Sequence, residues 1–452
     1  MTPKTVVRTG YGIFFDQAFY PGWAGGISVD GFNSTPSFSS TLGGMIPAFL
    51  LQEGFPQNFT PPPNISAGAL NGQYTNAGNN GGGFYRPFDA NRLPYSQQWN
   101  LTIEHQFTEN FYISAAYVAN KGTRLPSAEV PLNALNPSLL SMGSKLFDEF
   151  GPSDTVLDGV STPYAGWVNQ MAACPPTVAQ ALLPYPQYCG GIVGDNENAG
   201  NSTYHSFQFK AEKRFSHGAS LLTSYTNSKL ITSSDNTQSF SMGTQIYQIS
   251  PFQRSRNKSL AVDDVPQILS VAFTYALPFG KGQRFLGKGG PIGKVVGGWE
   301  LTNIFRLSSG VPMYFRNGEC NLPSEFDAAC IPATGSNPFA QSKGSFDPTK
   351  PLLNLSSFEA TGQLPTGYYF GSGSRISNLR GFGFYDHDIG LIKEIPLTEH
   401  VKIQVRGEFF NIWNWHTFTN NFVNDVSSPS FGMWNGGVSS PRNIQLGTKV
   451  IF

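Results

Sequence analysis

The residues of this sequence best able to bind a metal or act as nucleophiles are its four cysteines. They form two close pairs, Cys174 with Cys189 and Cys320 with Cys330, and each pair lies in a Pro-, Gly- and Asn-rich stretch without neighbouring histidines. These spacings do not match those of a zinc site. We therefore expect two local disulfides, which form in an oxidising compartment outside the cytoplasm. The alternative is four unrelated buried thiols.

Other patterns that could carry chemistry are incomplete. The segment Gly282–Gly289 nearly matches the phosphate-binding pattern G-x-x-x-x-G-K-[ST], but Gly289 replaces the hydroxyl residue that would hold Mg²⁺. The segment Gly194–Gly200 carries side-chain oxygens without the spacing or the terminal Glu of a calcium loop. The six histidines are scattered, and no serine stands in a G-x-S-x-G elbow. The sequence thus predicts no catalytic residue, no metal or cofactor site, and no enzyme.

Composition places the chain among folded, aromatic-rich proteins. The 452 residues carry 29 Lys and Arg against 29 Asp and Glu, so the net charge is zero and nothing favours a nucleic-acid partner. Charged residues make up 13% and aromatic residues 14%, unlike a disordered chain. No apolar run approaches the roughly 18 residues of a membrane-spanning helix. This excludes helical membrane proteins but not membrane β-barrels, whose strands need only about 9–11 alternating residues.

Apolar and polar residues alternate in the segments that could form regular structure. Phe207, Phe209 and Ala211 alternate with polar residues such as Lys210 and Glu212, which is the period of a β-strand with one apolar face. Short helical turns are expected within residues 137–150 and 175–183. The ten predicted strands span residues 4–16, 96–107, 109–121, 203–215, 218–231, 266–277, 295–309, 382–395, 400–413 and 441–452.

The connections between these strands alternate between long and short. In an antiparallel meander, alternate connections leave from opposite ends of the sheet, so all the long ones lie at one end. Short periplasmic turns and long extracellular loops are typical of outer-membrane barrels. The predicted strands also exceed the usual soluble length of about 5–6 residues. The pattern predicts an all-β fold, an antiparallel transmembrane β-barrel whose outward face contacts outer-membrane lipid. A soluble sandwich or propeller is the alternative.

Aromatic residues and long loops indicate where such a barrel would meet the membrane surface and a ligand. Aromatic side chains cluster near predicted strand ends, as in the girdles of membrane barrels. The loops 17–95, 122–202 and 310–381 could bind an unknown extracellular ligand, such as a glycan, a peptide or a siderophore, or could shield the surface. The girdle candidates are Tyr11, Phe14, Phe15, Trp99, Phe107, Phe111, Trp299, Phe384, Tyr385, Trp413 and Trp415.

Several stretches resemble TonB-dependent outer-membrane receptors, in particular the Oar-like group that carries a carboxypeptidase-regulatory-like domain. They include VVRTGYGIFFDQ, PYSQQWNLTIEHQFTENFYISAAYVANKGTRL, NSTYHSFQFKAEKRFSHGASLLTSYTNSK and NLRGFGFYDHDIGLIKEIPLTEHVKIQVRGEFFNIWNWHTF. The resemblance covers the chain in order, apart from the loop interiors. It implies a barrel of about 22 strands around an N-terminal plug. It also implies plug-gated import of a scarce ligand, driven through TonB.

Compared with that family, the sequence lacks a signal peptide, the regulatory-like domain, a TonB box, the plug and the early barrel strands. We therefore expect residues 1–452 to be the C-terminal part of the receptor barrel, contributing ten of its about 22 strands. Such a part would reach the TonB complex only through the missing plug. A closed ten-stranded barrel is less favoured, because the loops are out of scale for so small a lumen. The expected location is the outer membrane of a Gram-negative-type bacterium. A passive porin-like channel and an outer-membrane adhesion or surface-binding protein are the alternatives.

The last predicted strand carries an apolar row on one side. Leu446, Val450 and Phe452 belong to this row. The row resembles the C-terminal signal that the barrel-assembly machinery recognises, so we expect this strand to contact that machinery. The closing strand of a soluble sheet is the alternative.

Overall fold

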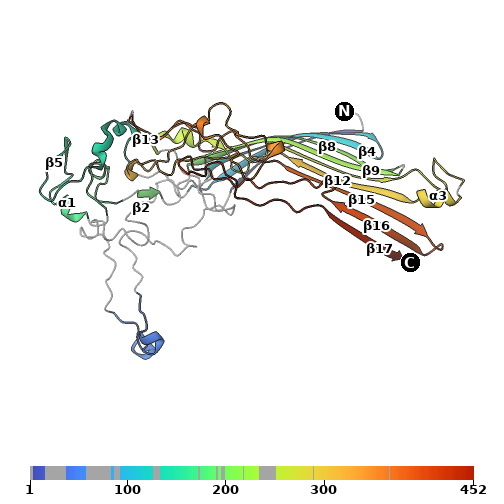
Figure 1. Ribbon diagram of the computed structural model, residues 1–452, viewed down its shortest axis with the longest axis horizontal. Coiled ribbons are helices and arrows are strands. Elements are labelled where there is room, and N and C mark those ends of the chain that lie inside the picture. The colour runs from blue at the N-terminus through green and yellow to red at the C-terminus, as the bar shows by residue number, and fades with distance from the viewer. Residues whose placement is uncertain are drawn as a thin grey trace.

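A computed structural model describes most of the chain. The described residues are 4–15, 37–57, 83–85, 92–125, 133–171, 174–189, 192–194, 199–216, 218–233, 251–288, 290–365 and 367–452. They form an elongated molecule, with a long sheet at one end and an assembly of connecting loops at the other (Figure 1).

Ten long strands form one antiparallel sheet, in which each strand pairs with the next one along the chain. All ten predicted strands are confirmed. Within the described residues, β1 pairs only with β3 and β17 only with β16, so the sheet is open at both edges. The strands are β1 (Thr5–Phe15), β3 (Tyr95–Thr108), β4 (Phe111–Leu125), β8 (Gly200–Ser216), β9 (Ala219–Thr232), β11 (Gln267–Ala276), β12 (Trp299–Ser308), β15 (Phe384–Pro396), β16 (Lys402–Phe410) and β17 (Asn443–Ile451).

Long and short connections alternate along the chain, as the sequence predicts. The short connections meet at one end of the sheet, which we call the short-turn end, and comprise residues 109–110, 217–218, 277–298 and 397–401. Gly218 adopts a φ of +77° in one of these turns, a conformation that glycine takes without steric cost. The long connections meet at the opposite end, the long-loop end, and comprise residues 16–94, 126–199, 233–266, 309–383 and 411–442.

The register of the strands sorts side chains into two faces. Successive residues of a strand point to opposite faces, and residues directly opposite each other on neighbouring strands share a face. One row on the apolar face contains Ile103, Ala115, Phe209, Tyr225, Leu269, Leu307 and Tyr385. The next row, on the polar face, contains Glu104, Ser114, Lys210, Ser224, Ser270, Arg306 and Asp386.

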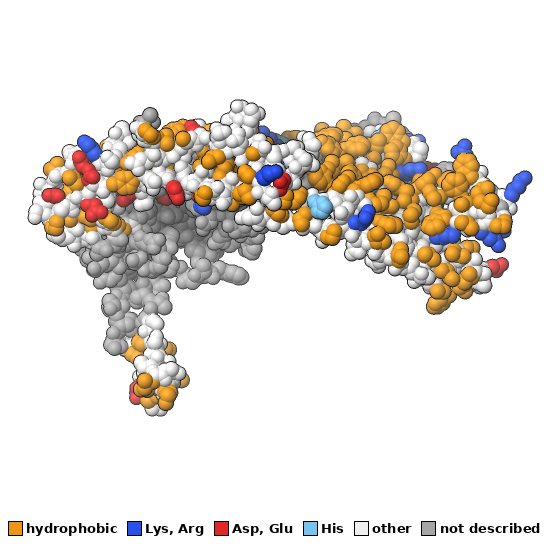
Figure 2. Space-filling model, in the orientation of Figure 1, with side chains coloured by type: hydrophobic (Ala, Val, Ile, Leu, Met, Phe, Trp, Pro, Cys, Tyr) orange, Lys and Arg blue, Asp and Glu red, His pale blue; other side chains and the backbone are white. Residues whose placement is uncertain are grey.

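The apolar face is exposed in the structure. Leu101, Ile103 and Phe207 each retain nearly half of their accessible surface, at 47%, 48% and 49%. In Figure 2, hydrophobic side chains cover the visible face of the sheet, whereas polar and charged side chains are interspersed over the loop assembly. Such a large exposed apolar surface is rare on a monomeric soluble protein and indicates that something apolar covers it.

The long connections contain short elements. The 3₁₀ segment η5 and the helix α2 confirm the two helical turns that the sequence predicts. None of the helices in the described residues combines the length and the apolarity needed to cross a bilayer. The elements are η2 (Leu42–Gly44), η3 (Leu51–Glu53), β2 (Gly83–Tyr85), η5 (Pro137–Phe147), β5 (Val156–Leu157), β6 (Val160–Ser161), α1 (Trp167–Gln170), α2 (Val178–Ala181), β7 (Ile192–Gly194), η6 (Pro251–Asn257), β10 (Ser259–Leu260), η7 (Ser324–Phe326), η8 (Lys343–Ser345), η9 (Leu355–Ser357), β13 (Gly362–Leu364) and β14 (Gly367–Tyr369), while α3 (Pro291–Val296) lies in the longest short connection.

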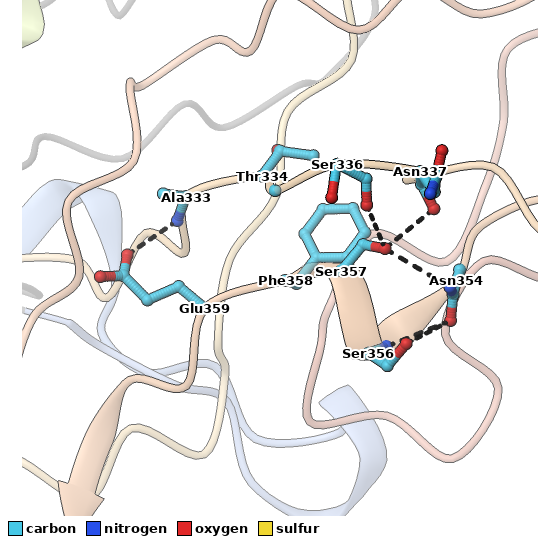
Figure 3. Close-up of a pocket in the computed structure, with 10 residues that line it drawn as sticks. Ala333, Thr334, Ser336, Asn337, Asn354, Ser356, Ser357, Phe358 and Glu359 are labelled. Atoms are coloured by element: carbon cyan, nitrogen blue, oxygen red, sulfur yellow. Dashed lines mark hydrogen bonds between the residues drawn. The ribbon is translucent and has the colours of Figure 1, made fainter.

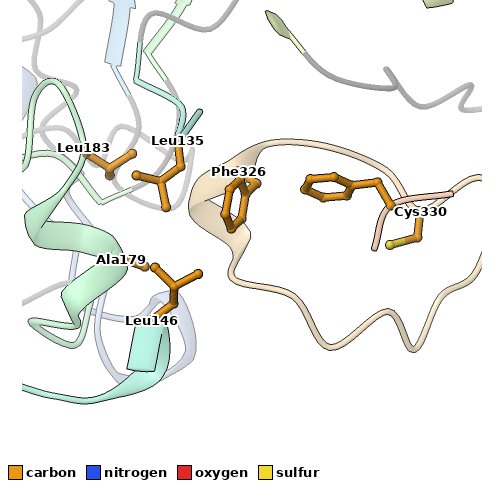
Figure 4. Packing of buried hydrophobic residues seen from close by; sticks show 7 residues of the cluster. Leu135, Leu146, Ala179, Leu183, Phe326 and Cys330 are labelled. Carbon is orange, nitrogen blue, oxygen red and sulfur yellow. The ribbon is translucent and has the colours of Figure 1, made fainter. Parts of the chain in front are cut away.

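The hydrophobic core lies in the loops rather than in the sheet. One cluster joins Leu135, Leu146 and Ala179 of the 126–199 connection to Phe326 and Phe370 of the 309–383 connection (Figure 4). A second cluster joins the 309–383 and 411–442 connections, and its buried members are Met313, Phe315, Leu352, Leu353, Phe382 and Phe431. Segments far apart in the sequence therefore pack into one loop assembly.

Candidate functional site

The polar face of the sheet carries a charge network that is satisfied within the sheet. Lys210 lies 3.0 Å from a carboxylate oxygen of Glu212 and donates to the Tyr112 hydroxyl at 2.8 Å. Tyr112 in turn donates to Glu212 at 2.9 Å. Tyr112 and Glu212 face each other on β4 and β8, with Lys210 on the next polar-face row of β8. The network holds three polar side chains in fixed positions on one face.

Further ion pairs lie on the same polar face. Arg8 pairs with Glu104 at 3.1 Å, and Lys402 pairs with Glu394 at 3.4 Å. Because both signs are present and several of the charges are paired, the face is hydrophilic without a strong field of one sign. It suits contact with water or with another polar protein segment.

The predicted aromatic girdle needs one correction. Tyr11 and Trp99 face each other on the apolar face, as the prediction requires. Phe14 instead pairs with Ser96, and Phe384 pairs with Ser308, so both phenylalanines belong to the polar face. The girdle prediction is wrong for these two residues, because neighbours along a strand point to opposite faces.

Two tryptophans of the predicted girdle follow the end of β16 at the long-loop end. Trp413 donates its indole N–H to Nδ1 of His387 at 2.7 Å. The other ring nitrogen of His387 lies 2.6 Å from Oδ1 of Asn303 on the neighbouring strand. Since Nδ1 accepts, Nε2 carries the proton and donates to Asn303. Both ring nitrogens of His387 are thus hydrogen-bonded within the apolar face. The ring of Trp415 lies beside that of Trp413.

A groove of about 570 Å³ crosses the surface of the loop assembly (Figure 3). Its walls come from two segments of the 309–383 connection. Ser357 Oγ ties these segments together, since it reaches the carbonyl oxygens of Asn337 at 2.8 Å and Ser336 at 2.9 Å. The lining residues are Ala333, Thr334, Gly335, Ser336, Asn337, Asn354, Ser356, Ser357, Phe358 and Glu359.

The carboxylate at one end of this groove is held by backbone donors. Glu359 accepts hydrogen bonds from the N–H groups of Ala333 at 2.9 Å and Ser372 at 2.8 Å. Burial raises the pKa of Glu359, but the N–H donors of Ser372 and Ala333 outweigh it, so the pKa lies below its usual value. The groove thus has a charged end and walls rich in hydroxyl and amide groups.

Both predicted cysteine pairs are joined in the structure. The Cα atoms lie 5.6 Å apart in the Cys174–Cys189 pair and 6.1 Å apart in the Cys320–Cys330 pair, within the usual range for disulfides. Cys330 is buried in the cluster that contains Phe326. The bond therefore anchors part of the loop assembly rather than forming a reactive site.

The remaining sequence motifs do not converge on a chemical site. Residues 282–288 form turns between β11 and β12, and Gly289 lies outside the described residues. In the segment Gly194–Gly200, residues 195–198 likewise lie outside them. Within the described ranges, no three His, Cys, Asp or Glu side chains are placed to hold a metal ion.

The candidate assembly residues lie at the edge strand. Leu446 and Val450 of β17 face Gly407 and Ile403 of β16 on the apolar face. Leu446 is 79% exposed, and Phe452, just beyond β17, is 95% exposed. These side chains are therefore accessible at an unpaired sheet edge.

Sequence reasoning missed the groove and the loop cores. The many phenylalanines of residues 310–381 were a usable signal, because phenylalanine this frequent favours a packed core over an exposed tether. Which phenylalanines pack together depends on contacts between separate loops, so no local pattern identifies them.

The chain shows the following similarities to known proteins. A family model described as "Outer membrane beta barrel domain" matches residues 1–445. No curated protein sequence shows significant similarity. One similar solved structure is the outer membrane transporter YddB from Escherichia coli, with 9% sequence identity and a TM-score of 0.36; the match covers 82% of this chain and 34% of that one. The ferric preacinetobactin receptor BauA from Acinetobacter baumannii has 9% identity and a TM-score of 0.33, over 79% of this chain and 30% of that one. The FrpB iron transporter from Neisseria meningitidis has 11% identity and a TM-score of 0.31, over 82% of this chain and 33% of that one. The chain spans about a third of the length of each structure.

Proposed function

The chain belongs to the outer membrane β-barrel domain family, and on that premise we propose that it forms the C-terminal part of a TonB-dependent receptor barrel of the Oar-like group. In this proposal the receptor takes up a scarce extracellular ligand through a plug-gated lumen. Ten strands contribute to a barrel of about 22. The proposal assigns no catalytic reaction to the chain.

Family membership places the chain in the outer membrane. In this proposal the apolar face contacts lipid, because the outward face of such barrels is apolar. Long loops of such barrels face the cell exterior and short turns face the periplasm. The loop assembly is therefore assigned to the extracellular side, and the short-turn end to the periplasm. The polar face is assigned to the lumen.

The organisation of the loop assembly is the observation that carries the receptor proposal. Loops that only shield a surface need no core, yet these loops bury Leu352, Phe326 and Trp167 almost completely. Burial of this extent fixes the loops in one arrangement, and a fixed arrangement lowers the entropic cost of binding a ligand. The groove beside Glu359 offers hydroxyl, amide and carboxylate groups, which suit a polar ligand such as a glycan or a peptide.

The polar face supports the plug in this proposal. Side chains such as Lys210, Glu212 and Tyr112 already satisfy one another, so a polar plug could dock against them without leaving a charge unpaired. TonB would act on that plug and not on the strands described here. The edge strands β1 and β17 would pair with the remaining barrel strands, which removes the hazard of open sheet edges.

Assembly into the membrane is assigned to β17. We propose that its exposed apolar row, Leu446, Val450 and Phe452, contacts the barrel-assembly machinery. A test is the amount of folded protein in outer-membrane fractions after Leu446→Asn, with Gln445→Asn on the polar face as control. Equal folded amounts in both variants would contradict this role.

The experiment for the receptor function measures uptake in cells that carry or lack the gene, each with and without TonB. The probes are fluorescently labelled oligosaccharides, oligopeptides and ferric siderophores, supplied separately. The receptor proposal expects one probe class to accumulate only when both the gene and TonB are present. A Ser336→Trp substitution in the groove should reduce that accumulation, whereas Val156→Trp at an exposed loop position should not.

The alternative functions predict different results. Uptake that needs the gene but not TonB identifies a passive porin-like channel. If no probe accumulates in a gene-dependent way and the cells lose attachment to surfaces on deletion of the gene, the chain serves in adhesion. Either result overturns the receptor proposal.

A further inference from the structure

Charged side chains are distributed unequally over the two faces of the sheet. Every Asp and Glu of the ten long strands, from Glu104 to Glu408, lies on the polar face. The apolar face of these strands carries no carboxylate but four lysines, Lys121, Lys213, Lys229 and Lys393. The lipid-facing side of the sheet is therefore purely cationic.

The ammonium group of one of these lysines is solvated by the protein itself. Lys393, near the short-turn end, donates to the carbonyl oxygens of Lys294 at 3.0 Å and Val295 at 2.9 Å. Its ammonium group also lies over the ring of Trp299, 5.2 Å from the centroid. The carbonyl groups at the end of α3 thus compensate this charge.

The long-loop end lacks such compensation. Trp99, Ala119, His205 and Lys229 follow one another across β3, β4, β8 and β9 in a single apolar-face row. Within the described residues, no hydrogen bond or ion pair engages Nζ of Lys229. Lys121 lies in the adjacent row towards the loops. Among the residues that the structure describes, its ammonium group reaches only the Thr203 hydroxyl, at 3.2 Å.

A third cation is turned onto the same area by an irregularity of β4. Arg124 sits at a register shift between Thr123 and Leu125, with a φ of +56°. This left-handed conformation is costly for a residue other than glycine, and bulges often redirect a side chain. The Arg124 guanidinium lies 5.8 Å from the centroid of the Tyr95 ring, which belongs to the apolar face.

We infer that Lys121, Arg124 and Lys229 form a binding site for the phosphate group of an anionic lipid in the outer leaflet. Trp99 and Tyr95 lie beside these cations, at the depth where amphipathic rings meet headgroups. A phosphate-bearing headgroup supplies the anion that the protein does not provide on this face, and its acyl chains continue along the apolar rows. This site rests on the lipid-facing assignment of the apolar face and is independent of the ligand uptake proposed above.

The test uses the full-length protein, purified from outer membranes and reconstituted in phosphatidylcholine vesicles. Electron paramagnetic resonance measures the association of spin-labelled phosphatidylglycerol relative to spin-labelled phosphatidylcholine. We expect a preference for phosphatidylglycerol that falls at least about fivefold in Lys121→Gln/Lys229→Gln, because one basic residue near an anionic membrane surface changes binding by about that factor. The Lys121→Arg/Lys229→Arg variant should keep the preference.

Three outcomes would overturn the site. The first is equal association of both lipids with the unchanged protein. The second is an equal loss of preference in Lys213→Gln, which would make the effect a general property of interfacial lysines. The third is displacement of the lipid by inorganic phosphate but not by chloride at equal ionic strength, which would identify free phosphate as the occupant.

Arg124→Gln, at the end of β4, provides a second variant if the double substitution impairs folding.

Discussion

Arg380 forms an ion pair with the buried Asp264, and the pair joins two long connections at residues 116 apart in sequence. Nη2 of Arg380 lies 2.5 Å from Oδ2 of Asp264, and the Asp264 side chain is only 1% exposed. Nη1 of Arg380 donates to the carbonyl oxygens of Asp264 at 2.7 Å and Gly310 at 3.1 Å. The second carboxylate oxygen of Asp264 accepts from the backbone N–H of Leu230 in β9 at 2.6 Å. One pair of side chains thus fixes the loop assembly to the end of the sheet.

Loss of this pair should open the loop assembly. In Arg380→Ala the buried carboxylate of Asp264 loses its counter-charge, and such a change typically costs about 3–5 kcal/mol. We expect faster hydrogen exchange of buried loop amides, such as that of Leu352, with unchanged exchange in the centres of β8 and β9.

The matched control is Lys350→Ala in the same connection. Lys350 forms an exposed pair with Asp347 at 3.1 Å, and exposed pairs contribute little. Exchange of the Leu352 amide should stay as in the unchanged protein. Equal acceleration in both variants would show that the Arg380–Asp264 pair has no special role.

The two faces of the sheet should respond differently to a charge. Ala115 and Ala116 are adjacent in β4, but Ala115 faces Phe209 on the apolar face and Ala116 faces Gln208 on the polar face. Ala115→Arg should lower the amount of folded protein in outer-membrane fractions, because arginine on the lipid face costs about 2–4 kcal/mol near the bilayer midplane. Ala116→Arg should be tolerated. The reverse order would invert the assignment of the faces.

The Cys320–Cys330 bond should stabilise one region of the loop assembly. Replacing both residues with serine removes a cross-link worth about 2–4 kcal/mol. We expect faster hydrogen exchange around Phe326 and Phe370, which pack against Cys330. Unchanged exchange in this region would refute the stabilising role.

A comparison with the second disulfide separates local from general effects. Replacing Cys174 and Cys189 with serine should accelerate exchange within residues 133–171 and 174–189 and leave the centres of β15 and β16 unaffected. Titration with a maleimide should detect no free thiol in the unchanged protein before reduction. A stoichiometric reaction before reduction would contradict both disulfides.

Acid should loosen the turn around Asp347. Hydrogen bonds from the side chain and backbone N–H of Thr349, together with the Lys350 ammonium group, lower the pKa of Asp347 to about 2. Because the folded-state pKa lies below the unfolded value of about 3.9, the ionised carboxylate stabilises the folded turn above pH 4. This contribution is lost as the pH falls from about 4 to 2.

The measurement is hydrogen exchange of the Lys350 amide, which donates to the Asp347 carbonyl at 3.1 Å. After correction for the intrinsic pH dependence, its protection should fall between pH 4 and pH 2. Asp347→Asn should remove this pH dependence, and persistence of the transition in that variant would assign it to another group.

The ten strands could be predicted because their signal is local. In β8, the alternation of Phe207 and Phe209 with Gln208 and Lys210 repeats every two residues, and a β-strand has the same period. The alternation of long and short connections followed from the strand positions alone. The same rule exposes the two errors of the girdle prediction, because Phe14 and Phe384 are each next to another girdle candidate, Phe15 and Tyr385, and neighbours must face opposite sides.

The loop assembly could not be predicted in this way. Phe326 packs against Leu135 across two connections, and Asp264 meets Arg380 between two others. No periodicity links such residues, because their contacts depend on how separate loops fold over one another. The groove beside Glu359 has the same origin, since its walls come from segments on either side of residue 345.

The sequence alone thus determined the strands, their order along the chain and the side of each strand that is apolar. These features arise from the two-residue repeat of the extended backbone, and a segment of about ten residues is long enough to show that repeat. Only the tertiary structure decided the register that brings Lys229 level with His205 and Trp99, and the packing that buries Asp264 against Arg380. Register and packing depend on contacts across the whole chain, and a local pattern carries no information about them.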